Sequence, residues 1–521
     1  MIHAIENLKI GDSSDFQTSP EPKTIEPLPT KKAREDLPCP KCGLFKGRKF
    51  LINCVQCNRN YHIRCVRANK AQAEALNFVC SPCRGVTVTV PEPTISPTQT
   101  IPSTQTTTDS QATPDTSTPD FSLLQHLQNR KASVSILGNI PRGARITAAD
   151  TLNQLITEAL ESNSSLAWAK LHCVASHGLK KTKREKSTPN SPSLATKIKS
   201  QLTDFSNSKF PPDDLSCPPR KANPKPKSSD ELLAKRVDAR FAEMDIRGAI
   251  RELSSDEKIA DDTLDTLTQL KSKHPEAPIG TSLPPAPENA DSHTPISSEA
   301  VRKAIISFPA GSAGGPDGLK PVHLKNLIGA SEAGNRLLLS VTKLCNFVLS
   351  DKIHEEIRPI FFGANLFAFS KKDRGIRPIA VGNTLRRLAT KVGLKPVTQE
   401  LGNFLRPNQL GYGTKGGSEA AAHAIRHYIS KNTKNKVFLK LDISNAFNSM
   451  RRDHILHKVK ETQPSLYNLF WQANSKPSHL FYRDKLLSSE SGLQQGDPGG
   501  PALFSLGLDQ IVKELRSKLN L

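Results

Sequence analysis

The fold of the C-terminal part of the chain is decided by residues 437–447, which read VFLKLDISNAF. An apolar run predicts a strand, Asp442 ends it, and a short turn containing Phe447 follows. A carboxylate at a strand end can hold Mg²⁺, and the backbone carbonyl of Ile443 offers a further oxygen ligand. A single Asp after a strand is more often a helix N-cap. The metal-binding interpretation therefore depends on other blocks of the sequence.

A second block follows at residues 491–498, which read SGLQQGDP. Gly496 allows a close approach of the backbone to a ligand, and Asp497 and Pro498 favour the start of a helix. The apolar face of that helix would be formed by Ala502, Leu503, Leu506 and Leu508. Without residues 437–447 this block would be interpreted as an ordinary turn.

Three further blocks lie upstream. Residues 314–318 read GGPDG and predict a rigid turn, and residues 371–379 read KKDRGIRPI, a basic hairpin. A Gly-rich connection follows at residues 409–413 (QLGYG) and 416–419 (GGSE). Arg386, Arg387 and Lys391 lie on the helix expected after the hairpin.

In this order, the blocks across residues 297–508 resemble the reverse transcriptases of non-LTR (LINE-like) retrotransposons. Residues 437–447 resemble motif A of these enzymes, and residues 491–498 resemble motif B. The resemblance implies an α+β palm and fingers, RNA-directed DNA synthesis, and RNA and DNA as partners.

The resemblance also implies roles for individual residues. Asp442 would be catalytic and would hold magnesium together with Ile443, and Phe447 would pack under the nucleotide sugar and exclude a 2′-OH. The nucleotide-binding residues would be Lys371, Lys372, Arg377, Phe447, Gln495 and Gly496. The cations of the following helix, Arg386, Arg387 and Lys391, would add positive surface for nucleotide and template.

The sequence departs from this family after motif B. Two-metal catalysis needs a second carboxylate cluster, usually an aromatic-x-Asp-Asp turn, and no such block occurs in the 521 residues. We therefore expect an incomplete domain that is inactive alone, encoded by a retrotransposon-derived gene or cut short at a gene-model boundary.

A separate Cys/His cluster lies near the N-terminus. Seven of the ten cysteines fall between Cys39 and Cys83, which points to metal in a reducing compartment and not to disulfides. Eight soft ligands in four close pairs predict two tetrahedral structural zinc sites. The ligands are Cys39, Cys42, Cys54, Cys57, His62, Cys65, Cys80 and Cys83.

Histidine is the fifth of the eight ligands, and this order resembles a PHD-type zinc finger. The family's cross-brace implies one zinc ion at Cys39, Cys42, His62 and Cys65, and the other at Cys54, Cys57, Cys80 and Cys83. The resemblance also implies a nuclear location and a histone H3 tail as partner. Val55 and Gln56 stand where the family often has an acidic residue.

Composition agrees with a nucleic-acid partner. The chain carries a formal net charge of +22 and is only 36% hydrophobic, and an excess of Lys and Arg favours polyanions. A soluble protein with basic linkers would have the same composition. No apolar run approaches the ~20 residues of a membrane span, and the polar N-terminus is not a secretory signal.

We expect a multidomain chain. Within residues 121–178, apolar residues recur at helix-like spacing: Leu152, Leu155, Ile156, Leu160 and Leu166. Residues 179–228 could equally be a solvated linker or a patch for nucleic acid or nuclear import. The expected regions are 1–36 disordered, 37–85 PHD-type finger, 86–120 Thr/Pro-rich linker, 121–178 helical, 179–228 basic Pro-rich linker, 229–296 helical, and 297–521 incomplete reverse-transcriptase fingers and palm.

The sequence thus predicts a retrotransposon-derived RNA-directed DNA polymerase fragment with a zinc-binding finger. The alternative is a non-enzymatic chromatin adaptor of the PHD type with a degenerate polymerase scaffold.

Overall fold

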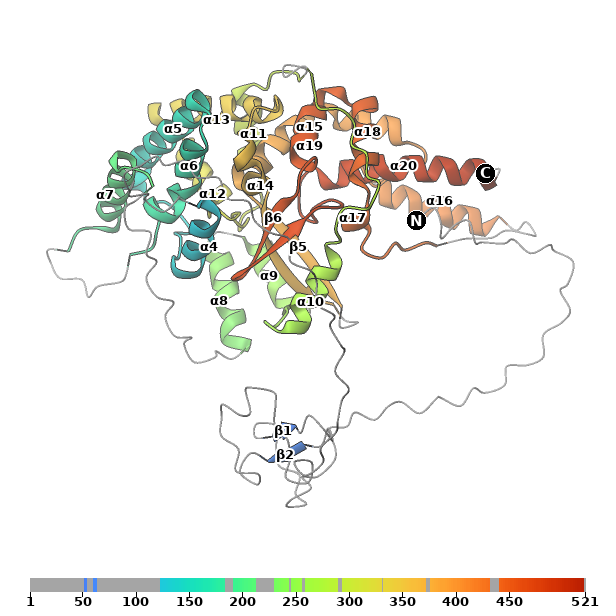
Figure 1. Cartoon of the computed structure of the whole chain (residues 1–521), viewed down its shortest axis with the longest axis horizontal. Helices are drawn as coiled ribbons and strands as arrows, with labels where there is room; N and C mark the ends of the chain where they lie inside the picture. The colour runs from blue at the N-terminus through green and yellow to red at the C-terminus, as the bar shows by residue number, and fades with distance from the viewer. Residues whose placement is uncertain are drawn as a thin grey trace, which may run out of the picture. The chain divides into compact units, whose positions relative to one another are not determined.

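The structure is a computed structural model that divides the chain into two compact units, Met1–Pro114 and Asp115–Leu521 (Figure 1). The residues it describes are 51–53, 60–62, 122–182, 191–211, 229–242, 245–254, 258–288, 293–329, 331–371, 375–431 and 440–519.

In the first unit the structure describes one short hairpin. β1 (Leu51–Asn53) pairs antiparallel with β2 (Asn60–His62), and Ile52 lies opposite Tyr61. His62 ends β2. The seven cysteines of the predicted zinc sites lie outside the described residues, as do residues 1–36 and 86–120. The zinc-binding finger therefore stays a prediction.

The second unit contains helices and strands in mixed order. In chain order they are α4 (Leu123–Ser133), η3 (Arg142–Ala144), α5 (Arg145–Ser162), α6 (Ser165–Gly178), α7 (Leu194–Asn207), α8 (Ser229–Ala242), α9 (Ile246–Ser254), β3 (Lys258–Ile259), α10 (Leu264–Lys273), α11 (Ser298–Ile306), α12 (Pro321–Leu327), α13 (Glu332–Leu349), η4 (Glu355–Ile357), α14 (Arg358–Phe361), β4 (Ala364–Ser370), β5 (Ile376–Gly382), α15 (Thr384–Leu405), α16 (Gly417–Ser430), α17 (Ala446–Ser449), α18 (Arg452–Thr462), η5 (Pro464–Leu466), α19 (Tyr467–Asn474), β6 (Ser478–Tyr482), β7 (Lys485–Ser489) and α20 (Gly500–Leu519).

The helical pattern expected at residues 121–178 forms three helices, and one residue of the predicted apolar face is misplaced. Leu152, Leu155 and Ile156 are buried in α5. Leu166 is 43% exposed. The reason is a helix break: Asn163 adopts a left-handed φ of 42°, and Ser164 caps the start of α6. Leu166 therefore belongs to a second helix with a different buried face.

α7 lies within residues 179–228, where the sequence predicts a linker. Ile198, Leu202 and Phe205 are buried and recur at i, i+4 and i+7, which gives α7 one apolar face. Ser193 caps the helix by accepting a hydrogen bond from the backbone N–H of Thr196 at 3.1 Å. The expectation of a linker is wrong for this segment, because basic composition hid a local helical period.

The sheet has the order β3-β4-β6-β7, with β3 and β6 paired to opposite ends of β4, and β5 pairs with β4 along its whole length. β4 and β5 form an antiparallel hairpin in which Phe369 lies opposite Arg377. The backbone N–H of Lys371 donates to the carbonyl of Gly375 at 2.8 Å. This confirms the hairpin predicted around residues 371–379. β6 runs parallel to β4, so a connection of many residues brings it back to the same sheet.

One hydrophobic core joins the N-terminal helices to the C-terminal ones, extending from Leu123 to Leu506. Trp168 is fully buried at its centre and makes an edge contact with Phe361, with ring centroids 5.8 Å apart. A second, smaller core lies against the sheet and includes Leu366, Leu480 and Leu270 of α10. The helices before residue 179 are therefore packed into the same unit as the sheet.

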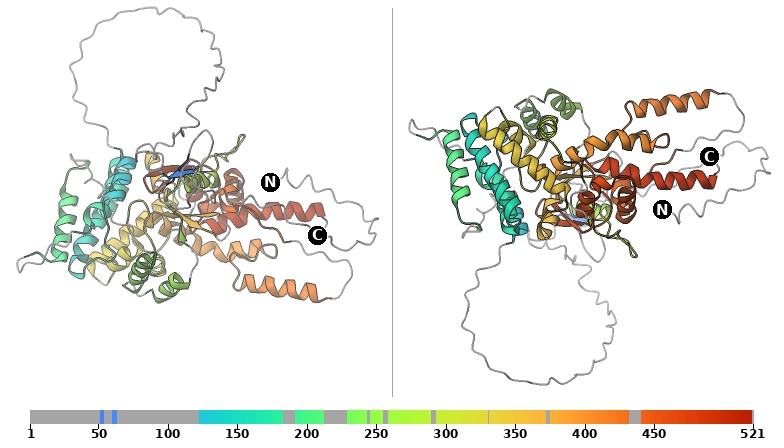
Figure 2. Two further views of the ribbon diagram at one scale, coloured as in Figure 1. Left: turned by 90° about the horizontal axis from the view of Figure 1, so that it is seen from below. Right: turned by 90° about the horizontal axis from the view of Figure 1, so that it is seen from above.

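α16 and the end of α20 extend away from the rest of this unit in both views of Figure 2. α16 is exposed along most of its length, including Ile425, Tyr428 and Ile429. Among the described helices, none combines the length and apolar character needed to cross a membrane.

Candidate active site

The two blocks that resemble motifs A and B meet in the structure. The backbone N–H of Leu493 donates to the carbonyl of Phe447 at 2.8 Å. Gly492 has a φ of +61°, and a Cβ there would lie 2.2 Å from the backbone of Asn448. Only glycine permits this approach. The turn at residues 445–448 and the turn at residues 492–497 are therefore held together backbone to backbone.

Phe447 is half-buried between elements of both blocks. Its ring stacks on Phe504 of α20, with centroids 4.8 Å apart and planes 12° apart. A Cβ on Gly500 would lie 3.2 Å from the Phe447 ring. The aromatic ring after Asp442 thus forms a wall beside the first turn of α20.

Two asparagines anchor the turn that carries Phe447. The Nδ2 atoms of Asn445 and Asn448 both donate to the carbonyl of Lys273, at 2.9 and 2.8 Å, at the end of α10. Asn445 has a left-handed φ of 54°, which Asn tolerates better than most residues. Sequence analysis missed Asn448, because its partner lies 175 residues away.

The turn at residues 492–497 also rests on the β4–β5 hairpin. The backbone N–H of Ala380 donates to the carbonyl of Gln495 at 2.7 Å. Gly496 has a φ of +117°, and a Cβ there would lie 2.6 Å from the carbonyl oxygen of Ala380. Gly496 itself is exposed, and Gln495 is half-buried. These two predicted nucleotide-binding residues thus lie where the hairpin and the start of α20 meet.

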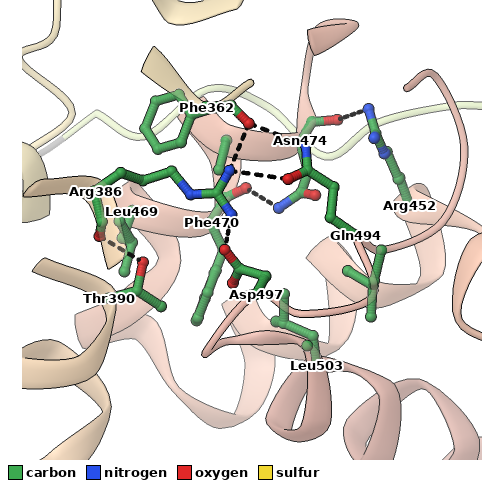
Figure 3. A pocket seen from close by; sticks show the side chains of 13 residues that line it. Phe362, Arg386, Thr390, Arg452, Leu469, Phe470, Asn474, Gln494, Asp497 and Leu503 are labelled. Carbon is green, nitrogen blue, oxygen red and sulfur yellow. Dashed lines mark hydrogen bonds and ion pairs between the residues drawn. The ribbon is translucent and has the colours of Figure 1, made fainter. Parts of the chain in front are cut away.

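A buried ion pair lies beneath this turn (Figure 3). The guanidinium of Arg386 pairs with the carboxylate of Asp497 and donates to the side-chain oxygen of Gln494 at 3.0 Å. Gln494 Nε2 donates to the carbonyl of Phe362 at 2.9 Å and to Ser478 Oγ at 3.0 Å. Burial lowers the pKa of Arg386 to about 9, so the group stays charged at neutral pH.

Arg386 was expected to add positive surface, and that prediction is wrong. The residue is only 4% exposed. The space among the residues in Figure 3 is about 30 Å³, too small for a nucleotide and sufficient for about one water. The physical reason is that Asp497, whose side chain is only 15% exposed, supplies a counter-charge, so a cation on α15 can face inward. Arg386 therefore holds the turn and does not contact template.

Arg452 is a second buried cation at this site (Figure 3). Its guanidinium donates to the carbonyls of Gly492 at 3.0 Å and Ser489 at 2.9 Å. Further acceptors are Ser489 Oγ and the carbonyls of Asn474 and Lys476. Sequence analysis missed this residue, because no local pattern marks an arginine whose acceptors are distant backbone carbonyls.

Arg387 and Lys391 pack on an aromatic ring. Arg387 lies 5.3 Å from the centroid of Phe308 and donates to the carbonyl of Ala313 at 2.8 Å. Lys391 Nζ lies 4.6 Å from the same ring. Burial lowers the pKa of both cations. Their packing supports the turn at residues 314–318, and their predicted contact with nucleotide or template stays a prediction.

The turn at residues 314–318 is rigid for reasons visible in its contacts. A Cβ on Gly315 would lie 2.5 Å from the backbone of Asn383. Asp317 is buried and accepts a hydrogen bond from the backbone N–H of Leu319 at 3.2 Å. Burial raises the pKa of Asp317 to about 7. The turn predicted from GGPDG is confirmed.

The predicted triphosphate contacts lie on the hairpin. Lys371 and Arg377 are exposed, and Lys372 lies outside the described residues. Arg377 points away from the buried face of β5, which is formed by Ile376, Pro378 and Ala380. This exposure leaves Lys371 and Arg377 accessible to a polyanion, as the predicted role requires.

Asp442 is exposed, and residues 440–443 have no regular structure. Leu441 is 70% exposed. The strand predicted before Asp442 lies mostly outside the described residues, and its last two residues are not in a strand. Among the described residues, Asp442 belongs to no group of three or more His, Cys, Asp or Glu side chains with converging ligand atoms. One carboxylate and the carbonyl of Ile443 do not make a two-metal site.

The described residues do contain one such group, His126, Cys173 and His177, with ligand atoms within 4.8 Å of one another. The Nε2 atoms of the two histidines are 3.1 Å apart, and their rings lie 11° from parallel with centroids 5.4 Å apart. The short distance between the two Nε2 atoms is that of a hydrogen bond between the edges of the rings. Burial and the charge of Arg130 lower the pKa of His126 to about 4 and of His177 to about 3. A neutral, hydrogen-bonded pair fits this environment better than a cation.

Comparison with protein families identifies the C-terminal region. Residues 369–521 match the model described as "Reverse transcriptase (RNA-dependent DNA polymerase)". The match begins near the end of β4 and includes β5, residues 437–447, residues 491–498 and α20. These residues form a reverse-transcriptase domain of mixed α/β content, a family that acts on nucleic acid with a divalent metal such as magnesium. No curated protein matches the chain.

Proposed function

We propose that the chain is an RNA-directed DNA polymerase of the non-LTR retrotransposon type, with a two-zinc PHD-type finger at its N-terminus. The observation that carries the polymerase assignment is a convergence of three segments. The turns at residues 445–448 and 492–497 and strand β5 are joined by backbone hydrogen bonds of 2.7 and 2.8 Å. The three segments are distant in sequence and lie within the matched residues.

The chain's own residues account for nucleotide positioning in this proposal. Exposed Gly496 offers open backbone for the incoming base, and Phe447 forms a rigid wall for its sugar. Because Phe504 stacks behind Phe447, the wall cannot easily retreat from a 2′-OH. This steric restriction favours deoxynucleotides.

Charge on the hairpin accounts for triphosphate binding. Exposed Lys371 and Arg377, with neighbouring Lys372, would neutralise the phosphates. A guanidinium suits this role because its planar donors match phosphate oxygens two at a time.

Asp442 would supply one carboxylate ligand for the two divalent ions that this family uses, of which one would activate the primer 3′-OH and the other would bind the triphosphate. A single carboxylate cannot hold two divalent ions against their mutual repulsion. We therefore propose that the 521-residue chain does not extend a primer unless further carboxylates join Asp442.

The N-terminal finger would bind two zinc ions through the eight ligands already named, and folding of so small a segment would depend on metal. A histone H3 tail is the partner we propose for it, and the nucleus is the location. Elemental analysis of residues 30–90 should find about two zinc equivalents. Zinc binding that survives Cys54→Ser with both ions retained would contradict the cross-brace.

The polymerase proposal is tested by primer extension. The 521-residue chain, given an RNA template, a DNA primer, all deoxynucleotides and Mg²⁺ or Mn²⁺, should show no synthesis. The same chain joined to the Asp-Asp block and thumb of a related enzyme should be active, and Asp442→Ala in that longer protein should abolish the activity. Synthesis that persists after Asp442→Ala would show that motif A is misplaced.

A second candidate function is a non-enzymatic chromatin adaptor. The isolation of Asp442 among the described residues favours it, because a degenerate scaffold would lose metal ligands first. Binding of histone H3 peptides to the chain, together with inactivity of the lengthened protein, would support the adaptor over the polymerase.

A further inference from the structure

A pocket of about 330 Å³ lies between the N-terminal helices and the turn at residues 314–318. Its lining residues fall between Leu127 and Asn365. All of them lie outside residues 369–521, which carry the reverse-transcriptase match. The pocket therefore shares no residue with the two turns and the strand β5 that carry the polymerase proposal, although the GGPDG turn forms one of its walls.

Close packing shapes this pocket. The backbone N–H of Lys181 donates to the carbonyl of Ser135 at 2.7 Å, which fixes the segment after α6 beside the segment after α4. Gly318 has a φ of +74°, and a Cβ there would lie 2.0 Å from the side chain of Ile136. The turn thus fits directly against the helical segment, and the pocket is built into the fold.

The pocket is strongly cationic. Four of its lining residues, Arg130, Lys131, Lys181 and Lys320, carry positive charge, and Asp317 is the one carboxyl group among them. Lys131 Nζ donates to the carbonyl of Phe481 at 3.0 Å, and burial lowers its pKa to about 8. Asp317 lies in the same wall with a raised pKa of about 7. A charge distribution of this kind favours an anionic ligand.

Asn365 indicates that the ligand of this pocket has a hydrogen-bond donor. The residue is only 8% exposed, and its side-chain oxygen is buried without a hydrogen-bond partner. Its Nδ2 atom donates to the carbonyl of Gly314 at 3.4 Å, so the amide nitrogen is already occupied and the oxygen is the group that lacks a partner. A buried amide oxygen without a donor is costly. The ligand should therefore carry an N–H or O–H group as well as negative charge.

We propose that this pocket binds a nucleoside phosphate unit, with the phosphate beside Lys131 and Lys181 and an N–H or O–H of the sugar or base donating to Asn365 Oδ1. An anion without a hydrogen-bond donor, such as sulfate, would leave Asn365 unsatisfied, and a metal ion would be repelled by the four cationic side chains. The pocket volume is within the range of sites for small ligands. The unit could belong to a single-stranded RNA or to a free nucleotide.

Two adjacent lysines provide a matched test. Lys181 lines the pocket and Lys180 does not, and both are exposed, so neither substitution should disturb folding. Binding of a fluorescent RNA of about 12 nucleotides to the full chain is measured by anisotropy over a range of salt concentrations. Lys181→Gln should weaken binding about fivefold and lower the salt slope by about one, and Lys180→Gln should change affinity less than about twofold. Equal effects of the two substitutions would overturn the proposal, because bulk charge alone would then explain binding.

A second variant tests the hydrogen-bond acceptor. Asn365→Asp preserves size and places a carboxylate in the pocket, so binding should fall more than about tenfold. Near-ultraviolet circular dichroism shows whether the Asn365→Asp variant folds. If it does not fold, the proposal is tested by the Lys181→Gln and Lys180→Gln variants alone. Competition with UMP separates the sources, since displacement of RNA by micromolar UMP identifies a free nucleotide and its failure identifies a strand. Cross-links from 4-thiouridine RNA that avoid residues 127–136 and 313–320 entirely would also overturn the proposal. None of these measurements depends on DNA synthesis, so a failed polymerase proposal would not affect them.

Discussion

The turn at residues 492–497 and the segment at residues 440–443 belong to the same proposed site, yet they are held very differently. The turn contacts β5, the Phe447 turn, Arg386 and Arg452 through hydrogen bonds and a buried ion pair. The segment with Asp442 is irregular and exposed. The comparison indicates that the scaffold of the proposed nucleotide site is built by this unit itself, whereas the position of the proposed metal ligand is not fixed by the described residues.

The largest expected effect comes from breaking the ion pair beneath the turn. Arg386→Met leaves the carboxylate of Asp497, whose side chain is only 15% exposed, without its partner, and should lower the free energy of unfolding by about 3 kcal/mol. Urea denaturation of the 521-residue chain measures the change. Arg336→Met is the control, because Arg336 pairs with Asp150 at 2.8 Å on the surface, with its side chain 48% exposed. That variant should lose far less stability, because exposed ion pairs contribute little. Similar losses for the two variants would contradict a buried, structural role for Arg386.

Acid should destabilise the scaffold through its buried histidines. Burial lowers the pKa of both His172 and His323 from 6.5 to about 4. In the unfolded chain they take up protons below pH 6.5, whereas in the folded chain they remain neutral until about pH 4. Stability should therefore be complete above pH 6.5 and fall as pH drops toward 4, by about 1.4 kcal/mol per unit for each histidine.

Urea midpoints at about pH 7.5 and pH 5.5 measure this dependence. A variant in which His172 is replaced by Gln should show a shallower loss of stability between the two values than the parent. An unchanged dependence would show that His172 is already protonated, or equally exposed, in the folded state.

A moderate effect is expected from the anchor of the Phe447 turn. Asn448→Ala removes the hydrogen bond to the carbonyl of Lys273 at 2.8 Å, so this half-buried acceptor loses one of its two donors. The free energy of unfolding should fall by about 1–2 kcal/mol. Asn403→Ala is a control on an exposed face of α15 and should change it by less than about 0.5 kcal/mol. Equal losses would show that the Lys273 contact does not hold the turn.

Local patterns in the sequence predicted the elements that local chemistry determines. The GGPDG turn, the hairpin around residues 371–379 and the helix after Asp497 follow from turn residues, alternation and capping. Arg386 could not be placed from sequence, because its burial depends on a carboxylate 111 positions later. The same applies to Arg452 and Asn448, whose partners are distant backbone carbonyls. The sequence analysis did not predict α7, because the basic and Pro-rich composition of residues 179–228 concealed the helical spacing of its three buried apolar residues.

The smallest effect on stability, and the largest on chemistry, is expected at Asp442. Its side chain is exposed, and among the described residues the structure gives it no hydrogen bond or ion pair. Asp442→Ala should therefore change the free energy of unfolding of the 521-residue chain by less than about 0.5 kcal/mol. In the protein lengthened by the Asp-Asp block and thumb, the same substitution should abolish primer extension. RNA binding should stay within about twofold of the parent, since one exposed carboxylate contributes little to polyanion affinity.

Asp453→Ala is the control. This carboxylate is 4% exposed and accepts a hydrogen bond from Arg451, so its loss should lower stability. The lengthened protein with this substitution should retain primer extension in proportion to the fraction that is folded. If Asp442→Ala instead unfolded the chain, Asp442 would be a structural residue of the scaffold, and the difference between the two segments of the site would disappear.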